Sequence, residues 1–255
     1  MARKSSGRFL ALLDGLAIAA WGLLFWKYWL TGKLFLLIHP NYMWLTVASG
    51  GALLLLASWK ISSLIRQFQQ APQPGATPTT QHITFFPPGW GSTLLLAIAL
   101  LGFIVSPRAF ASETAIQRGV TDTLTLTRTK PQAFRASSRS EDKSLIDWIR
   151  TLNVYPEPDA YTGQKVKVQG FVIHPKQLPD QYFLISRFVI TCCAADVYPV
   201  SLPVKLTQSR SAYQPDSWLE VEGQMITETI AGKRQLTIQA KSLKPIPEPK
   251  NPYDY

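Results

Sequence analysis

The chain has 255 residues, a formal net charge of +10 and an uneven composition. Its first 110 residues are rich in Leu, Ala, Trp and Gly, whereas the remainder has the composition of a soluble β-rich domain, which argues against a single uniform domain. The positive charge favours anionic partners such as nucleic acid or lipid head groups. Basic residues that flank membrane spans account for the same excess, and we favour this second interpretation.

Three apolar segments in the N-terminal part are each long enough to cross a bilayer, because about 20 residues at ~1.5 Å per residue traverse ~30 Å of hydrocarbon. We therefore predict a transmembrane domain over residues 1–110, with spans at 9–30, 40–59 and 85–105. Aromatic residues lie near the ends of these segments, where interfacial belts form. A cleaved signal peptide is the competing interpretation of the first segment, but two further apolar segments follow it.

The orientation of these spans follows from the Lys and Arg residues of the short loops. Basic residues are more frequent before the first span and after the second than between them. By the positive-inside rule, the N-terminus is cytoplasmic and a domain that follows three spans is extracytoplasmic. We therefore predict a multi-pass protein of the cytoplasmic (plasma) membrane.

Two charged residues, Asp14 and Lys27, interrupt the first predicted span. An Asp in the membrane costs about 2.5–3.5 kcal/mol on insertion scales and usually faces a partner or a water path. Asp14 is also close enough to the interface to reach Arg8 or water, which is the simpler interpretation. Lys27 is expected to extend its amine outward.

Small residues on the first two spans predict close helix packing. Gly15, Ala19 and Gly22 lie on the first span, and residues 48–52 form a small-residue cluster on the second. Small residues let two helix backbones approach each other. The contact is either internal or made with another membrane protein.

Two polar stretches separate the apolar segments from each other and from the rest of the chain. Residues 67–84, rich in Gln, Pro and Thr, predict a flexible cytoplasmic loop. Residues 111–139 predict a flexible tether between the membrane and the C-terminal domain.

Residues 140–255 show one short helix followed by short alternating strands. Ser140 is expected to cap the helix. Strands are expected at 165–173, 182–191, 197–206, 218–225 and 235–243. Gly170 and Gly223 hold similar positions in two strands and suit a bulge or a sharp coil. We predict an α-helical membrane region of three spans plus a C-terminal all-β domain, an OB-like five-stranded barrel preceded by a short helix, with a small sandwich as the alternative.

The two cysteines of the chain, Cys192 and Cys193, are adjacent and are followed by Asp196. They admit four interpretations: buried apolar residues, a vicinal disulfide, ligands of zinc or another thiophilic metal such as copper(I), and a redox pair without the usual CxxC spacing. Two thiolates are too few for a closed zinc site. His174, His39, Asp196 or a partner would have to complete it, although a lone loop histidine such as His39 is more often only a loop residue.

Two segments of the C-terminal domain follow a recognisable pattern. The first reads GxxVxVxGFV and the second FxIxCCxADxxP, carried by Gly163, Val166, Val168, Gly170, Phe171 and Val172, and by Phe188, Ile190, Cys192, Cys193, Ala195, Asp196 and Pro199. With the N-terminal spans and an HPxY-like loop, this pattern resembles the YcgQ-type family of permease subunits. The resemblance implies a companion of a separate multi-spanning permease. It implies neither a transported substrate nor catalytic residues.

We therefore expect a membrane-anchored accessory subunit of a permease complex, whose outer domain binds cargo, a metal or the permease through the Cys192–Cys193 region. The alternative is an extracytoplasmic metal or haem chaperone tethered to the membrane. Nucleic-acid binding is disfavoured because the domain is expected outside the cytoplasm. The sequence has no Ser/His/Asp set, carboxylate pair with a pocket signature or phosphate loop, so we do not expect an enzyme.

Overall fold

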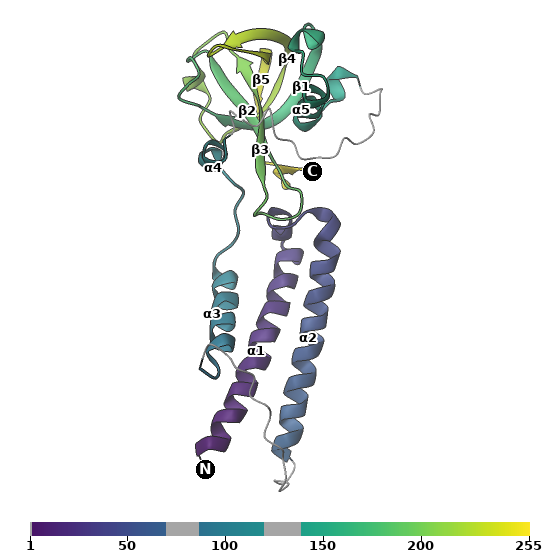
Figure 1. Cartoon of the computed structure of the whole chain (residues 1–255), viewed down its shortest axis with the longest axis vertical. Helices are drawn as coiled ribbons and strands as arrows, with labels where there is room; N and C mark the ends of the chain where they lie inside the picture. Colours follow the sequence, from purple (N-terminus) through teal and green to yellow (C-terminus); the bar gives the residue numbers. More distant parts are fainter. Residues whose placement is uncertain (1, 70–86, 120–138) are drawn as a thin grey trace. The chain divides into compact units, whose positions relative to one another are not determined.

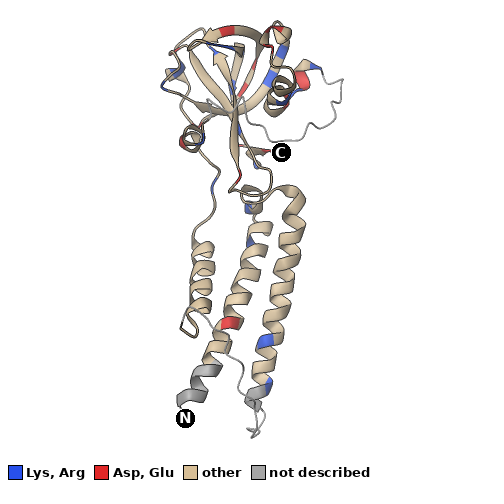
Figure 2. Ribbon diagram, in the orientation of Figure 1, with Lys and Arg blue, Asp and Glu red and all other residues tan. Residues whose placement is uncertain are grey.

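The computed structural model describes residues 2–69, 87–119 and 139–255. The chain divides into two compact units, Met1–Arg108 and Ala109–Tyr255 (Figure 1). Among the residues coloured in Figure 2, Lys, Arg, Asp and Glu are sparse along the helices of the first unit and frequent in the second. The first unit therefore has the apolar surface that a hydrocarbon environment requires.

Two helices of the first unit are long and apolar enough to cross a membrane. Helix α1 covers Ala2–Leu30 and helix α2 covers Pro40–Gln69, joined through a short 3-10 turn at Lys33–Leu36. Their apolar parts are Phe9–Leu30 and Pro40–Arg66. The bounds predicted for the first apolar segment match the apolar part of α1, but the second segment was predicted to end at residue 59. Helix α2 continues past this point, so Lys60 lies on the helix and not in a loop.

The third apolar segment forms a shorter helix, α3, over Trp90–Ile104. Its 15 residues cover about 22 Å at ~1.5 Å per residue, less than the ~30 Å of a hydrocarbon core. The predicted span at 85–105 is thus too long. Gly89, whose φ of 89° lies in the left-handed region, starts the helix later than predicted. The predicted loop at 67–84 falls outside the described residues from residue 70 onward.

Helix α1 lies between α2 and α3 and packs against both (Figure 1). Gly22 of α1 faces Gly50 of α2: a Cβ atom on Gly22 would lie 3.0 Å from the Gly50 carbonyl oxygen. The indole N–H of Trp26 donates to the carbonyl of Val47 at 3.2 Å. Of the two contacts predicted for the small residues, the internal one is therefore confirmed at Gly22 and Gly50.

Side chains of α1 bind the carbonyl groups at the C-terminus of α3. The Tyr28 hydroxyl donates to the Gly102 carbonyl at 2.6 Å, and the Lys27 amine donates to the Phe103 carbonyl at 2.7 Å. The last carbonyls of a helix have no partner within it, and an unsatisfied carbonyl in hydrocarbon costs several kcal/mol. The sequence predicted that Lys27 extends outward. This prediction is wrong, because the Lys27 amine reaches the neighbouring helix α3.

The second unit is built on one mixed six-stranded sheet. The strands are β1 (Lys165–Ile173), β2 (Tyr182–Val189), β3 (Tyr198–Lys205), β4 (Trp218–Ile230), β5 (Lys233–Pro245) and β6 (Tyr253–Asp254). Their order is β1-β4-β5-β3-β2-β6, and β1 also pairs with β2, so the hydrogen bonds of the first five strands close into a ring. The five predicted strands are present, β4 and β5 are longer than predicted, and the sequence analysis missed β6.

Helix α5 (Leu145–Val154) packs its apolar face into the core of this sheet, with Trp148 fully buried. Its N-cap is Ser144, whose hydroxyl accepts the amide N–H of Asp147 at 3.2 Å, while the Asp147 carboxylate accepts the amide N–H of Ser144 at 3.1 Å. This reciprocal capping box fixes the start of the helix. The prediction of Ser140 as the cap is wrong, because Ser140 lies in a separate 3-10 turn.

Helix α4 (Ser112–Gln117) lies within the stretch that the sequence analysis predicts to be a tether. Just before it, the ring of Phe110 packs against Phe188 and Tyr253 of the sheet. Residues 120–138 of the same stretch lie outside the described residues.

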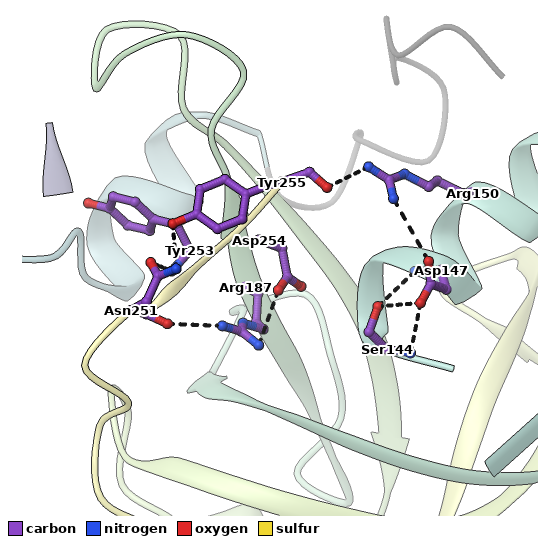
Figure 3. A network of polar contacts seen from close by, with 8 residues as sticks. All are labelled: Ser144, Asp147, Arg150, Arg187, Asn251, Tyr253, Asp254 and Tyr255. Carbon is purple, nitrogen blue, oxygen red and sulfur yellow. Dashed lines mark hydrogen bonds and ion pairs between the residues drawn. The ribbon is translucent and has the colours of Figure 1, made fainter. Parts of the chain in front are cut away.

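A polar network holds the chain's last residues against the sheet (Figure 3). Strand β6 pairs with the end of β2, and the Asp254 carboxylate forms an ion pair with Arg187 at 3.2 Å. Arg187 also donates to the Asn251 carbonyl at 3.2 Å, and Arg150 of α5 donates to the Tyr255 carbonyl at 2.7 Å. The last residues of the chain are therefore part of the domain, next to the end of β2.

Two glycines let the ring of strands close. Strand β4 bulges between Glu222 and Gly223, as predicted for that position, and a Cβ atom on Gly223 would collide with the carbonyl of Gln239. A Cβ atom on Gly170 would overlap the carbonyl of Ser186 on β2, at the point where β1 begins to pair with β2 as well as β4.

We expect Gly223→Ala to lower the free energy of unfolding of the second unit by about 1–3 kcal/mol, because the backbone must move to accommodate the methyl group. Thermal unfolding of the detergent-solubilised chain, followed by near-ultraviolet circular dichroism, measures the change. Gly232→Asn is the matched control, since that turn has open space and a φ of 77° that Asn tolerates. Equal effects of the two substitutions would contradict this account of Gly223.

Candidate functional site

Both cysteines lie on the loop that connects β2 to β3. Cys192 is exposed and Cys193 is half-buried, both thiols are free, and their Sγ atoms are 3.6 Å apart. The exposure of Cys192 contradicts the interpretation of the pair as buried apolar residues. The loop begins at Ile190, which is buried and donates its amide N–H to the Asp254 carbonyl at 3.1 Å, and it ends at the buried Val197. Both ends of the loop are thus fixed by the domain core.

The carboxylate of Asp196 organises the backbone between these ends. It accepts the amide N–H of Cys192 at 2.9 Å and that of Cys193 at 3.1 Å, and it also accepts the hydroxyl of Thr191. The amide N–H of Asp196 in turn donates to the Cys193 carbonyl at 3.0 Å, which closes the turn. One side chain therefore holds both thiol-bearing residues on the same side of the loop.

The hydrogen bonds of the loop also set the protonation of its side chains. The contact with Cys193, followed by that with Asp196, raises the pKa of the Cys192 thiol to about 11. Burial opposes ionisation of Asp196, but hydrogen bonds from Thr191 and the amides of Cys193 and Cys192 outweigh it and lower the pKa of that carboxyl. At neutral pH the site therefore presents a carboxylate beside a protonated Cys192 thiol. A thiol with a raised pKa is a poor nucleophile, which argues against covalent catalysis.

Three potential metal-ligand atoms converge in this loop. The sulfur atoms of Cys192 and Cys193 and a carboxylate oxygen of Asp196 all lie within 4.8 Å of one another. Among the described residues, these three side chains form the group of His, Cys, Asp or Glu whose ligand atoms lie close enough together to hold one metal ion. Two sulfurs and a carboxylate oxygen are ligand types that zinc accepts, and they leave a fourth position open.

Of the two histidines predicted as further ligands, His174 does not join this group. His174 follows the end of β1, where Ile173 pairs with Leu184 near the start of β2, whereas Cys192 follows the end of β2. Burial and the nearby charge of Arg210 lower the pKa of His174. His39 belongs to the first unit, where its Nδ1 atom accepts the amide N–H of Asn41 at 3.1 Å.

Asp14, in the apolar part of α1, has partners on both neighbouring helices. Its carboxylate forms an ion pair with the Lys60 amine at 2.8 Å and accepts the hydroxyl of Ser92. The simpler prediction, that Asp14 reaches Arg8 or water, therefore missed its partners. Sequence reasoning overlooked Lys60 because the second span was ended one residue too early to include it. Nothing in the sequence around Ser92 indicated a contact with Asp14, apart from its position near the start of an apolar segment.

The second unit is thus a small β domain with a ring of strand pairings and an exposed dithiol loop, on a chain that also has two long apolar helices. Residues 129–255 match the family described as the DUF1980 C-terminal domain. No protein in the curated set matches the chain. The family match includes both cysteines and Asp196, and the family's description assigns no activity to them.

We expect Cys193→Ala to lower the pKa of Cys192 from about 11 toward its ordinary value of 9.0, because the largest cause of the shift is removed. The pH dependence of alkylation by iodoacetamide, with the modified residue identified by mass spectrometry, measures this pKa. Below the pKa, each unit of decrease raises the thiolate fraction about tenfold, so the alkylation rate at pH 8 should rise several-fold. The Cys192→Ala variant reports the separate reaction of Cys193. If the alkylation rate of Cys192 in the unsubstituted chain has its inflection near pH 9, the raised pKa of this thiol is contradicted.

Proposed function

We propose that this chain is a membrane-anchored accessory subunit of a permease complex, and that its C-terminal domain binds a thiophilic metal ion, zinc being the first choice. The observation that carries the proposal is the convergence of Cys192, Cys193 and Asp196 on an exposed loop with rigid ends. The two long apolar helices support the membrane anchor. The resemblance of the CCxAD segment to YcgQ-type permease subunits supports the kind of partner.

The proposal includes a more detailed architecture. Helix α3 is the third membrane-embedded helix, the N-terminus is cytoplasmic and the β domain is extracytoplasmic. The ring of five strand pairings supports an OB-like barrel for this domain. In this topology the dithiol loop faces an oxidising compartment, where a bound metal protects the thiols from forming a disulfide.

The spacing of the thiols favours zinc. Two sulfur ligands at ~2.3 Å from a tetrahedral ion lie roughly 3.8 Å apart. The observed Sγ–Sγ distance of 3.6 Å requires little movement of either side chain. Binding must displace the thiol protons, so affinity should increase with pH. The open fourth position leaves room for a ligand from the permease or for exchange of the ion.

A metal chaperone tethered to the membrane is the second candidate. The exposure of Cys192 favours it, because an acceptor protein can approach the metal without moving the domain. The two candidates differ in assembly. A permease subunit elutes after mild solubilisation as part of a larger complex with a multi-spanning protein, whereas a chaperone elutes alone and transfers its metal to a chelating acceptor.

The metal site is tested by titrating the reduced, full-length chain in detergent with Zn²⁺ against a chromophoric chelator. We expect one ion per chain, bound at least tenfold more weakly at pH 6 than at pH 8. The Cys192→Ser, Cys193→Ser double variant should lose this binding, and Asp196→Asn should weaken it about tenfold.

The His174→Ala variant is the matched control and should bind Zn²⁺ as the unsubstituted chain does, because His174 lies outside the cluster. If the double cysteine variant keeps the site, or if His174→Ala removes it, the proposed ligand set is wrong. A reporter fused after Tyr255 tests the topology separately, with an extracytoplasmic signal expected.

A further inference from the structure

A cavity of about 380 Å³ lies among the three helices of the first unit. Its lining residues come from α1, α2 and α3. Its lining is polar where Asp14, Lys60 and Ser92 meet, and apolar further along, where Trp21 and Phe25 lie. The volume is within the ~300–1,000 Å³ of small-molecule sites, and an apolar pocket with a few convergent polar groups is the usual form of such sites.

The polar end of this cavity lies at the level expected for lipid head groups. Helix α2 rises about 30 Å from Pro40 to Lys60, which is the thickness of a hydrocarbon core. Trp59 and Trp90 are next to this end in the sequence and are both exposed, as interfacial tryptophans are.

The apolar part of the cavity extends from that level toward the centre of the membrane. Asp14 and Phe25 are separated by about 16 Å along α1 at ~1.5 Å per residue. The occupant that fits is therefore polar at one end and apolar along the rest, with the orientation of a bilayer lipid.

The charges at the polar end are only partly covered by this chain. The side chains of Asp14 and Lys60 remain 39% and 32% exposed. The Lys60 amine has three N–H donors, and within the described residues Asp14 takes one of them. An acyl chain laid against these groups would leave both partly exposed charges facing hydrocarbon, which is unfavourable. The occupant must therefore bring polar atoms to this end.

We propose that the cavity binds one phospholipid with a primary-amine head group. Its phosphate accepts hydrogen bonds from Lys60, its ammonium group donates to Asp14, and one acyl chain lies along Trp21 and Phe25. The lining carries one positive and one negative charge, so a zwitterionic head group complements both. A trimethylammonium head group has no N–H to donate to Asp14, and an anionic glycerol head group brings a second negative charge that must share Lys60 with Asp14. This inference depends on the proposed membrane anchor but not on the metal site.

The test uses native mass spectrometry of the full-length chain, delipidated in detergent and then titrated with phosphatidylethanolamine, phosphatidylcholine or phosphatidylglycerol of identical acyl chains. We expect one phosphatidylethanolamine to be retained per chain, with at least tenfold preference over each of the others. Lys60→Gln should remove this preference. Equal retention of the three lipids, or retention of none, overturns the proposal, and the latter result makes a helix of a partner protein the better occupant.

Substitutions at the polar end also disturb helix packing, so a second pair of variants blocks only the apolar part. Leu53 of α2 lines the cavity, whereas Leu55, two residues further on, is 74% exposed and does not. Leu53→Trp should reduce retention of phosphatidylethanolamine at least tenfold, and Leu55→Trp should leave it unchanged. Equal effects of the two variants would place the lipid elsewhere on the chain.

Extraction of membranes at alkaline pH separates failure of this inference from failure of the proposed function. Release of the chain from the membrane refutes the anchor and this inference with it. A chain that stays in the membrane but shows no lipid preference refutes the inference alone.

Discussion

The closure of the strand ring is the constraint on which the second unit depends. Strand β1 pairs with β4 along most of its length and adds a second partner, β2, only after Gly170. Because this position has no side chain, the two backbones can approach each other, and a Cβ atom there would overlap the Ser186 carbonyl. Closure fixes β2 in the core of the domain. The end of β2 then carries the dithiol loop, so the position of the site follows from the closure.

The tail of the chain stabilises the same end of β2. Strand β6 pairs with Phe188 and Val189, and the Asp254 carbonyl accepts the amide N–H of Ile190, two residues before Cys192. The Asp254–Arg187 ion pair is mostly buried. Burial raises the pKa of Asp254 although the charge of Arg187 opposes it, so the pair adds little net stability as an ion pair. We interpret its role as fixing the register of a strand only two residues long.

Much of the domain could be predicted from the sequence because its strands alternate clearly. Lys165–Ile173 was predicted with its observed bounds, and Gly223 was predicted at a bulge that the sheet contains. The helix cap was predicted at the wrong residue because Ser140 and Ser144 both precede acidic residues. The reciprocal hydrogen bonds between Ser144 and Asp147 identify Ser144 as the cap. Strand β6 was missed because its pairing is non-local and its sequence, between prolines and the end of the chain, has no strand pattern.

The candidate sites show what sequence patterns leave undetermined. Adjacent cysteines followed by Asp196 suggested a metal site, but nothing in the pattern excluded His174, which the fold places at the opposite end of β2. Lys60 was missed for a different reason. The second predicted span ended at residue 59, immediately before a charged residue, and so assigned to a loop the residue that forms an ion pair with Asp14 on the neighbouring helix.

The two aspartates use their carboxylates in different ways, and this difference determines what each can bind. Asp14 is paired with one side-chain charge and a hydroxyl, so it keeps capacity for a further donor. Asp196 already accepts two amides and the Thr191 hydroxyl, and it interacts with the Cys192 thiol. A carboxylate has about four acceptor sites, so a metal can reach Asp196 only by replacing the thiol proton. The sulfur atoms would then carry most of the metal affinity, with Asp196 acting mainly to hold them together.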